Sequence, residues 1–251
     1  MMVYPRTMRI WQPNRKINTK TIEFNLVNPL LETIDKPGPA LKSLPNWYKD
    51  MSPYMFGNEE FILQNKQTNL TVKKCVPFLD ALGAGYFIPS PADIAVRQLP
   101  DSPRLTWLSE FDVISYHDLE QIKGIEIPDG YDKQPFKWMN PWVVKTPKGY
   151  SSLFIHPINR TDLPFFSFAG IVDTDEFPLP VNFPFLMKKD FTGVIEAGTP
   201  MIQVIPFKRD DWNSKVLLEN DISEYNKNLF DFSSKVKHYY RNKWWKRKNY
   251  K

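Results

Sequence analysis

The sequence of 251 residues is long enough to bury a sizeable core in one main domain, and its 42% hydrophobic and 24% charged content exclude a largely disordered chain. Its net charge of +5 is modest but uneven, because basic residues gather near the C-terminal end. The single cysteine, Cys75, excludes an internal disulfide, and no apolar run has the length of a membrane span or the apolar core of a signal peptide. We therefore expect a protein that acts in the cytoplasm without a membrane contact.

The composition favours short strands over long helices. Aromatic residues make up 15% of the chain, and 23 prolines outnumber 10 glycines, so that apolar runs are interrupted every few residues. In chain order, the sequence predicts a strand at residues 21–27, a short helical turn at 40–43, a helix at 76–82, and a hairpin-like pair of strands at 86–88 and 94–96.

A second series of β-rich runs follows at short spacing, which is typical of a β-sandwich or barrel. These runs cover residues 105–107, 111–116, 142–145, 152–155, 165–172, 181–186 and 193–207. We therefore predict a mainly β, sandwich- or barrel-like core at residues 71–212. An N-terminal extension, residues 1–70, would pack on this core, and residues 213–251 would form a basic amphipathic helix.

The C-terminal helix is predicted from an apolar stripe with the period of a helix. The stripe consists of Ile222, Tyr225, Leu229, Phe232, Val236 and Tyr239. Residues 235–251 contain eight Lys or Arg residues, five aromatic residues and no acid. Cations contact phosphates and flat rings stack on bases, so nucleic acid or an acidic protein is one candidate partner. The residues that would contact it are Arg241, Lys243, Trp244, Trp245, Lys246 and Arg247. The alternative is a helix whose aromatic side docks on the domain while its lysines stay solvated.

Polar side chains gather after two of the predicted strands, within residues 141–209. His156, Asn159 and Arg160 follow the first strand, and a turn could present them together to grip an anion. Asp173 and Asp175 follow the second, on one face of extended chain, where they could hold a divalent metal such as Mg²⁺ or activate water.

Each of these residues also has a structural interpretation. Arg160 could form a local ion pair with Asp162, and His156 could be a half-buried histidine with both ring nitrogens bonded. The two aspartates could cap backbone amides in a turn. Other chemistries lack their motifs: the sequence has no phosphate-binding glycine loop, no glycine-flanked serine nucleophile and no ligand-spaced Cys or His pair for zinc.

Three segments carry a resemblance to a known superfamily. The stretch GIVDTDEF at 170–177 and the later GTPMIQVIPF at 198–207 are similar to paired motifs of the dUTPase and dCTP deaminase superfamily, and GAGYFIPSPADIAV at 83–96 looks like its first conserved strand region. The resemblance implies a β-clip fold, a nucleotide pocket and a homo-oligomer whose subunits share that pocket.

The same resemblance suggests roles for three residues. Asp173 would activate water, Gln203 would supply an amide at the pocket, and Arg160 would bind phosphate. The family's Arg-Ser pair is replaced by Arg160 and Thr161, and Glu176 stands in place of its base-stacking tyrosine. The motifs therefore support binding of a nucleotide better than its hydrolysis.

Over its whole length, the chain resembles a family of unknown activity that tailed bacteriophages and some bacteria encode. The resemblance lies in LPNWYKDM, KCVPFLDALGAGY, NPWVVKTPKGYSSLFIHPINR and VNFPF. It implies a protein of the infected host's cytoplasm. The leading hypothesis is thus a pocket that binds, and in the enzymatic version hydrolyses, a phosphorylated small molecule. The alternatives are a non-enzymatic virion, assembly or host-factor-sequestering protein, and a single-stranded nucleic-acid binder.

Overall fold

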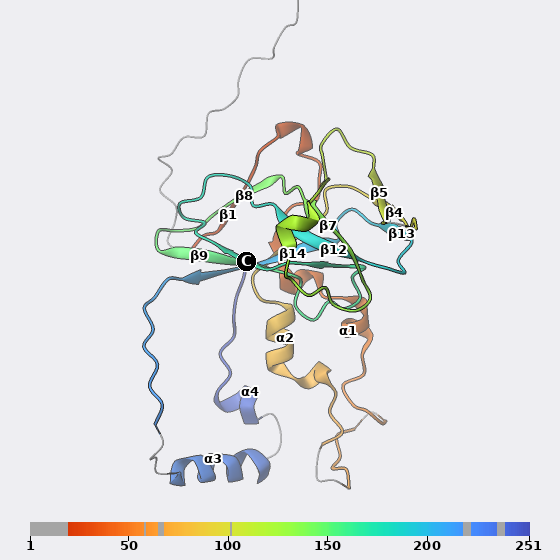
Figure 1. The fold of residues 1–251 in the computed structure, drawn as a ribbon. Coiled ribbons are helices and arrows are strands. Elements are labelled where there is room, and N and C mark those ends of the chain that lie inside the picture. Colours follow the sequence, from red (N-terminus) through yellow and green to blue (C-terminus); the bar gives the residue numbers. More distant parts are fainter. Residues whose placement is uncertain (1–19, 58, 65–67, 101, 218–221, 235–238) are drawn as a thin grey trace, which may run out of the picture.

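The computed structural model describes residues 20–57, 59–64, 68–100, 102–217, 222–234 and 239–251 (Figure 1). Most of its regular structure is β, and every strand pairing is antiparallel. The sheets of these described residues are open, so the predicted mainly β core is confirmed without a closed barrel. None of the described helices is long and apolar enough to cross a membrane.

A five-stranded sheet positions most of the predicted site residues. Its order is β11 (Gly170–Val172), β9 (Tyr150–Ile155), β14 (Pro200–Lys208), β3 (Tyr86–Pro89) and β2 (Gly38–Pro39). The long strand β14 lies at its centre and pairs with β9 from Gln203 opposite Ile155 to Lys208 opposite Tyr150. The two ends of this strand pair therefore lie at opposite edges of the body.

Smaller sheets complete the body. One has the order β10 (Phe165–Ser167), β12 (Phe183–Lys188), β7 (Tyr131–Trp138) and β6 (Ile114–Tyr116). Another has the order β13 (Gly193–Ile195), β4 (Ile94–Arg97) and β5 (Arg104–Trp107). A further pair joins β1 (Glu23–Leu26) to β8 (Trp142–Lys145).

Buried aromatic rings pack within the four-stranded sheet, and a chain of hydrogen bonds joins this sheet to the five-stranded one. Trp138 stacks on Phe185 with ring centroids 4.0 Å apart, and Phe165 meets Trp138 edge-on at 5.1 Å. The Trp138 indole donates to the Ser167 hydroxyl, which in turn donates to the Met201 carbonyl on β14 at 2.8 Å. Because buried polar atoms are costly when unpaired, this chain of bonds fixes the two sheets relative to each other.

The predicted hairpin of strands at 86–88 and 94–96 is wrong. Both strands exist, but β3 pairs with β14 and β2, whereas β4 pairs with β5 and β13. Prolines at 89 and 91 flank the link between them, and the Ser90 amide donates to the Thr199 carbonyl instead of closing a hairpin. The predicted run at 165–172 likewise divides into β10 and β11, which lie in different sheets.

Short helices cover one end of the five-stranded sheet. The predicted helix at 76–82 is α2 (Val76–Leu82), and the predicted turn at 40–43 is a 3-10 helix (Ala40–Ser43). A further α-helix, α1, spans Asn46–Asp50, and 3-10 turns occupy Pro29–Leu31, Val72–Lys74 and Leu119–Ile122. Gly85, after α2, has φ +63°, and a Cβ there would lie 2.0 Å from the Val204 carbonyl oxygen. Only glycine allows α2 and β14 to approach this closely.

The C-terminal segment leaves the body after β14 and returns to it (Figure 1). Residues 209–217 have no regular secondary structure, α3 spans Ser223–Ser234 and α4 spans Tyr239–Lys243. A single helix over 213–251 is thus not confirmed: among the described residues of this segment, only those of α3 and α4 are helical, and residues 213–217 and 244–251 are not. Val236 of the stripe lies outside the described residues.

Candidate functional site

Asp173 and Asp175 lie together, although in a turn rather than on one face of extended chain, and both contact one cation. Arg209, directly after β14, donates from Nη1 and Nη2 to the two carboxylate oxygens of Asp175 at 2.8 and 2.5 Å. Its Nη1 also lies 3.2 Å from Oδ1 of Asp173, which accepts a 2.6 Å bond from the Ser151 hydroxyl. The Gly149 amide donates to Asp175 at 2.8 Å. The carboxylates therefore cap a turn and pair with an arginine.

These bonds favour the charged form of Asp175. The Arg209 hydrogen bonds, and then the Gly149 amide, lower the pKa of Asp175 to about 2 against the opposing effect of burial. The Asp175 side chain is only 2% exposed, whereas that of Asp173 is 63% exposed. Both oxygens of Asp175 are already occupied, so this carboxylate is a poor general base.

The aspartates also fit a magnesium ion badly. A divalent cation bound to Asp175 would lie against the Arg209 guanidinium and would have to displace its two hydrogen bonds. Among the residues that the structure describes, no group of three or more His, Cys, Asp and Glu side chains could hold a metal. No reaction step through Mg²⁺ follows from this arrangement.

The turn after β9 holds His156, Asn159 and Arg160. His156 Nδ1 accepts from the Ser167 amide at 3.3 Å, so Nε2 carries the proton and donates to the Arg160 carbonyl at 3.2 Å. Burial, aided by the Arg160 charge, lowers the pKa of His156 below its usual value. Asn159 is exposed and has φ +59° at the tip of the turn. His156 therefore stabilises the turn as a neutral ring.

Arg160 is the cation of this turn, and its side chain is mostly enclosed. Its Nε and Nη2 donate to Asp162 at 2.8–3.1 Å, and Trp47 Nε1 donates to the same carboxylate at 3.1 Å. Although burial alone would raise the pKa of Asp162, the bonds from Arg160 and Trp47 hold it below its usual value. Nη1 of Arg160 has no acceptor among the described residues, which leaves it available to an anion.

Gln203 is completely buried and braces this region. Its Oε1 accepts from the Ile158 amide at 2.8 Å, and its Nε2 donates to the carbonyls of Ala81 and Ala84 at 3.1 and 2.6 Å. One side chain thus joins β14, the end of α2 and the turn that carries Arg160. In this structure Gln203 supports the turn and does not face a hollow.

The predicted site residues share one sheet but divide between its two ends. Asp173 meets Ser151 at the start of β9, whereas Arg160 follows the end of β9. Five residues of extended chain separate these ends, which is roughly 16 Å at about 3.3 Å per residue. The interpretation of Arg160, Gln203 and both aspartates as one pocket is therefore wrong in geometry.

Two adjoining hollows lie at the Arg160 end. One, of about 400 Å³, is lined by Ser43, Leu44, Pro45, Asn46, Trp47, Arg160, Asp162 and Pro200. The other, of about 230 Å³, is lined by Asp35, Lys36, Gly38, Pro39, Lys42, Ser43, Phe87, Pro89, Gly198 and Pro200. Because Ser43 and Pro200 line both hollows, they form one groove between the 3-10 turn at 40–43 and the start of β14.

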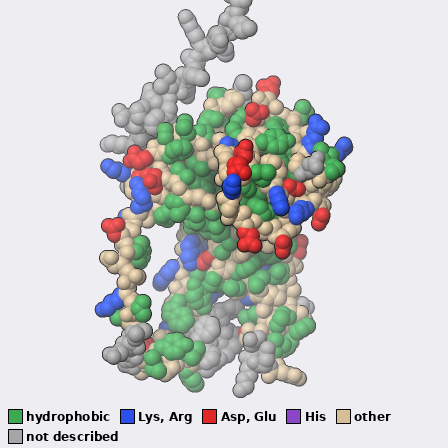
Figure 2. Space-filling view, in the orientation of Figure 1, with side chains coloured by type: hydrophobic (Ala, Val, Ile, Leu, Met, Phe, Trp, Pro, Cys, Tyr) green, Lys and Arg blue, Asp and Glu red, His purple; other side chains and the backbone are tan. Residues whose placement is uncertain are grey.

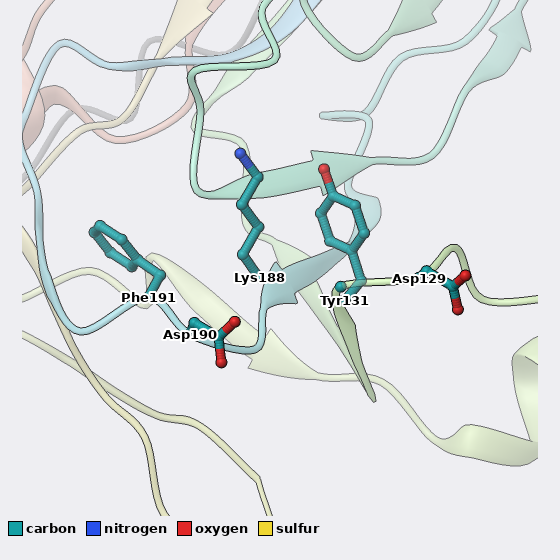
Figure 3. A pocket seen from close by; sticks show the side chains of 6 residues that line it. Asp129, Tyr131, Lys188, Asp190 and Phe191 are labelled. Carbon is teal, nitrogen blue, oxygen red and sulfur yellow. The ribbon is translucent and has the colours of Figure 1, made fainter.

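A further hollow of about 400 Å³ differs in its charge. It lies beside β7 and β12 and is lined by Asp129, Gly130, Tyr131, Lys188, Asp190 and Phe191 (Figure 3). The Lys188 ammonium points away from Asp190 in this view and donates to the Thr161 carbonyl at 2.7 Å. The carboxylates of Asp129 and Asp190 disfavour a phosphorylated ligand there.

The basic residues of the C-terminal segment have two different environments. Trp245 donates from its indole to Asp80 on α2 at 2.8 Å, so this ring is partly a packing residue. The side chains of Arg241, Lys243, Trp244, Lys246 and Arg247 are exposed. The docking interpretation of the tail thus applies to Trp245, and partner binding by the exposed residues stays a prediction.

Sequence reasoning missed several residues at these sites. Arg209 could have been found only from the strand pairing, which brings the end of β14 beside the turn after β11. Trp47, Lys36 and Lys42 lie in and beside the short helices at 40–43 and 46–50, and the place of this segment on the body has no local signal. The chain matches no model of a known protein family, and a search of curated proteins finds no match.

Proposed function

We propose that the protein binds a small phosphorylated ligand, such as a nucleotide, in the groove between Trp47, Arg160 and the 36–43 segment. The main support for this proposal is that the Arg160 guanidinium lies in the wall of the larger hollow and that its Nη1 is available to an anion. Asp162 fixes the orientation of this guanidinium, so little side-chain entropy would be lost on binding.

The charges of the groove suit an anion. Lys36 and Lys42 line the smaller hollow and are exposed at its rim. Asp162 is already paired with Arg160, which leaves Asp35 as the carboxylate opposing the two lysines. The half-buried ring of Trp47 lies in the wall of the larger hollow, where a flat base could pack against it. A phosphate group between Arg160 and the two lysines, with a base against Trp47, would span the two hollows.

Binding without hydrolysis is the form of the proposal that the contacts favour. The aspartates proposed as catalytic pair with Arg209 at the other end of β9 and β14, and Gln203 uses its amide inside the body. Neither group lines the groove. The groove therefore acts as a binding site, and Asp173 and Asp175 support the sheet.

Calorimetric titration of the full chain with nucleoside mono-, di- and triphosphates tests this proposal. The double variant Lys36→Gln with Lys42→Gln should weaken binding at least about tenfold, since charge-assisted bonds contribute about 1.5–3 kcal/mol each. Lys123→Gln with Lys133→Gln makes the same change in charge on another face and should bind as the unaltered protein does.

Asp173→Asn provides the complementary test, because it lies at the Arg209 end. It should leave nucleotide affinity unchanged. Loss of binding, or of a measured phosphate release, in Asp173→Asn would place the ligand at the aspartates and overturn the groove assignment. Failure of every nucleotide to bind would overturn the ligand class.

The alternative is a non-enzymatic assembly protein that functions as a homo-oligomer. The exposed apolar side chains of the segment after β14 favour it, with Trp212 89%, Val216 82% and Phe230 67% exposed. Sedimentation velocity would show a species larger than one chain that Trp212→Ser with Phe230→Ser reduces to the monomer. A monomer at all concentrations would exclude this alternative.

A further inference from the structure

The end of the chain is strongly basic. Residues 239–251 contain no acid, and their basic residues are Arg241, Lys243, Lys246, Arg247, Lys248 and Lys251. In Figure 2, Lys and Arg side chains gather along the stretch between α4 and the body. A partner of this stretch must therefore be anionic.

Contacts of Trp245 and Lys248 with Asp80, and of Tyr250 with Tyr86, hold this basic stretch against the body and are called the clasp below. The carboxylate of Asp80 accepts from the Trp245 indole at 2.8 Å and from the Lys248 ammonium at 2.7 Å. Beyond it, Tyr250 meets the Tyr86 ring edge-on at 5.8 Å. These contacts place three residues of the stretch against α2 and β3 and leave the residues between them on the outside.

The residues outside the clasp combine flat rings with cations. Trp244 is 40% exposed and Tyr240 is 37% exposed. The Lys243 ammonium lies 5.1 Å from the centre of the Trp244 ring, so a cation and a ring face occupy one patch. Arg241, Lys246 and Arg247 are exposed beside them. Cations alone would suit any polyanion, whereas exposed ring faces select bases that are not already stacked.

We propose that residues 240–247 bind single-stranded nucleic acid without sequence preference. Trp244 and Tyr240 stack on bases, while Arg241, Lys243, Lys246 and Arg247 contact phosphates. Trp245 acts instead as the anchor, through Asp80. The surface is separate from the groove at Arg160 and does not depend on the ligand proposed there.

Fluorescence anisotropy with an oligodeoxythymidine of about 15 nucleotides tests the proposal on the full chain. Trp244→Ala should weaken binding by about tenfold, as expected for one lost stacked base. Trp212→Ala removes another exposed tryptophan, outside the basic stretch, and should leave the affinity unchanged.

The salt dependence separates phosphate contacts from stacking. Lys246→Gln with Arg247→Gln should reduce the slope of log affinity against log salt by about 1.4, at about 0.7 per phosphate on a single strand. Trp244→Ala should leave that slope unchanged. Lys189→Gln with Lys133→Gln, away from the stretch, should alter neither quantity.

Several outcomes would overturn the proposal. No binding at low salt would reject a nucleic-acid partner. Equal affinity for a duplex of the same length, for polyglutamate, or for vesicles of anionic lipid would show that charge alone attracts the partner. Equal losses in Trp244→Ala and Trp212→Ala would reject stacking at Trp244. Circular dichroism of each variant would establish that the fold is intact.

Discussion

Replacing Gln203 by leucine is expected to destabilise the fold rather than to weaken ligand binding alone. Leucine has a similar size but cannot bond to the Ile158 amide or to the carbonyls of Ala81 and Ala84. The Ile158 amide and the Ala84 carbonyl would each lose a partner, at about 1–2 kcal/mol apiece. The Ala81 carbonyl would keep a 3.5 Å hydrogen bond from the Ala84 amide, so the loss of its bond to Gln203 costs less free energy.

The expected loss in the free energy of unfolding is therefore about 3 kcal/mol. For a chain of this size, each kcal/mol shifts Tm by about 2–4 °C, so Tm should fall by roughly 6–12 °C. Urea denaturation followed by circular dichroism measures the loss directly. Gln121→Leu is the matched control, because the Gln121 side chain is exposed and, among the described residues, accepts its hydrogen bond from the exposed Asp118 amide. That change should stay within about 0.5 kcal/mol.

Gln203→Glu adds a pH dependence with a defined sign. One carboxylate oxygen would face the carbonyls of Ala81 and Ala84, so the folded state would hold the new carboxyl in its neutral form and raise its pKa above the unfolded value of about 4.3. The stability of this variant should therefore fall as the pH rises above about 4, and its unfolding free energy should be lower at pH 7 than that of Gln203→Leu. An unchanged Tm in Gln203→Leu, or a Gln203→Glu variant insensitive to pH, would refute the bracing role.

Other variants test the remaining contacts. Because the pKa of Asp175 is lowered to about 2, its contribution to stability is complete above about pH 4 and is lost as the pH falls toward 2. Asp175→Asn should therefore remove this pH dependence of the unfolding free energy, measured by urea denaturation. The expected change is roughly 1 kcal/mol, because solvent screens the partly exposed Arg209. His156 has its pKa lowered by burial, so its protonation should destabilise the fold as the pH falls below about 6.5; an NMR titration that gives a higher pKa would contradict its neutral tautomer. Gly85→Ala should lower Tm by several degrees or prevent folding, because its Cβ would overlap the Val204 carbonyl; a soluble variant with the original Tm would contradict the close approach.

Local patterns predicted where many strands lie but not how they pair. The runs around residues 86–88, 94–96 and 105–107 are strands, as their apolar residues predict, yet β3 and β4 find partners, β14 and β13, in a distant part of the chain. Strand β7 was missed altogether. Pro135 lies in its middle, where a proline normally excludes a strand, and the irregular pairing after Leu186 of β12 accommodates it.

The candidate site was predicted in its parts rather than in its arrangement. Asp173 and Asp175 do lie together, but in a turn and not on one face of extended chain, and Arg160 pairs with Asp162 as the structural interpretation of that turn predicted. What the sequence could not provide was the register of β9 against β14. That register brings Arg209 to the aspartates and separates them from Arg160 by the length of a strand.

The clasp at Asp80 also determines the order in which the molecule assembles. Trp245 and Asp80 are 165 residues apart, so their contact closes a very long loop and can form only after nearly the whole chain has been synthesised. By then the strands of the body can already have paired. Few buried contacts hold the last residues, so we expect them to open and close against α2 as a separate cooperative unit. In hydrogen exchange, the amides after Tyr240 should therefore exchange faster than those of β14, which stay protected when the C-terminal residues detach from α2.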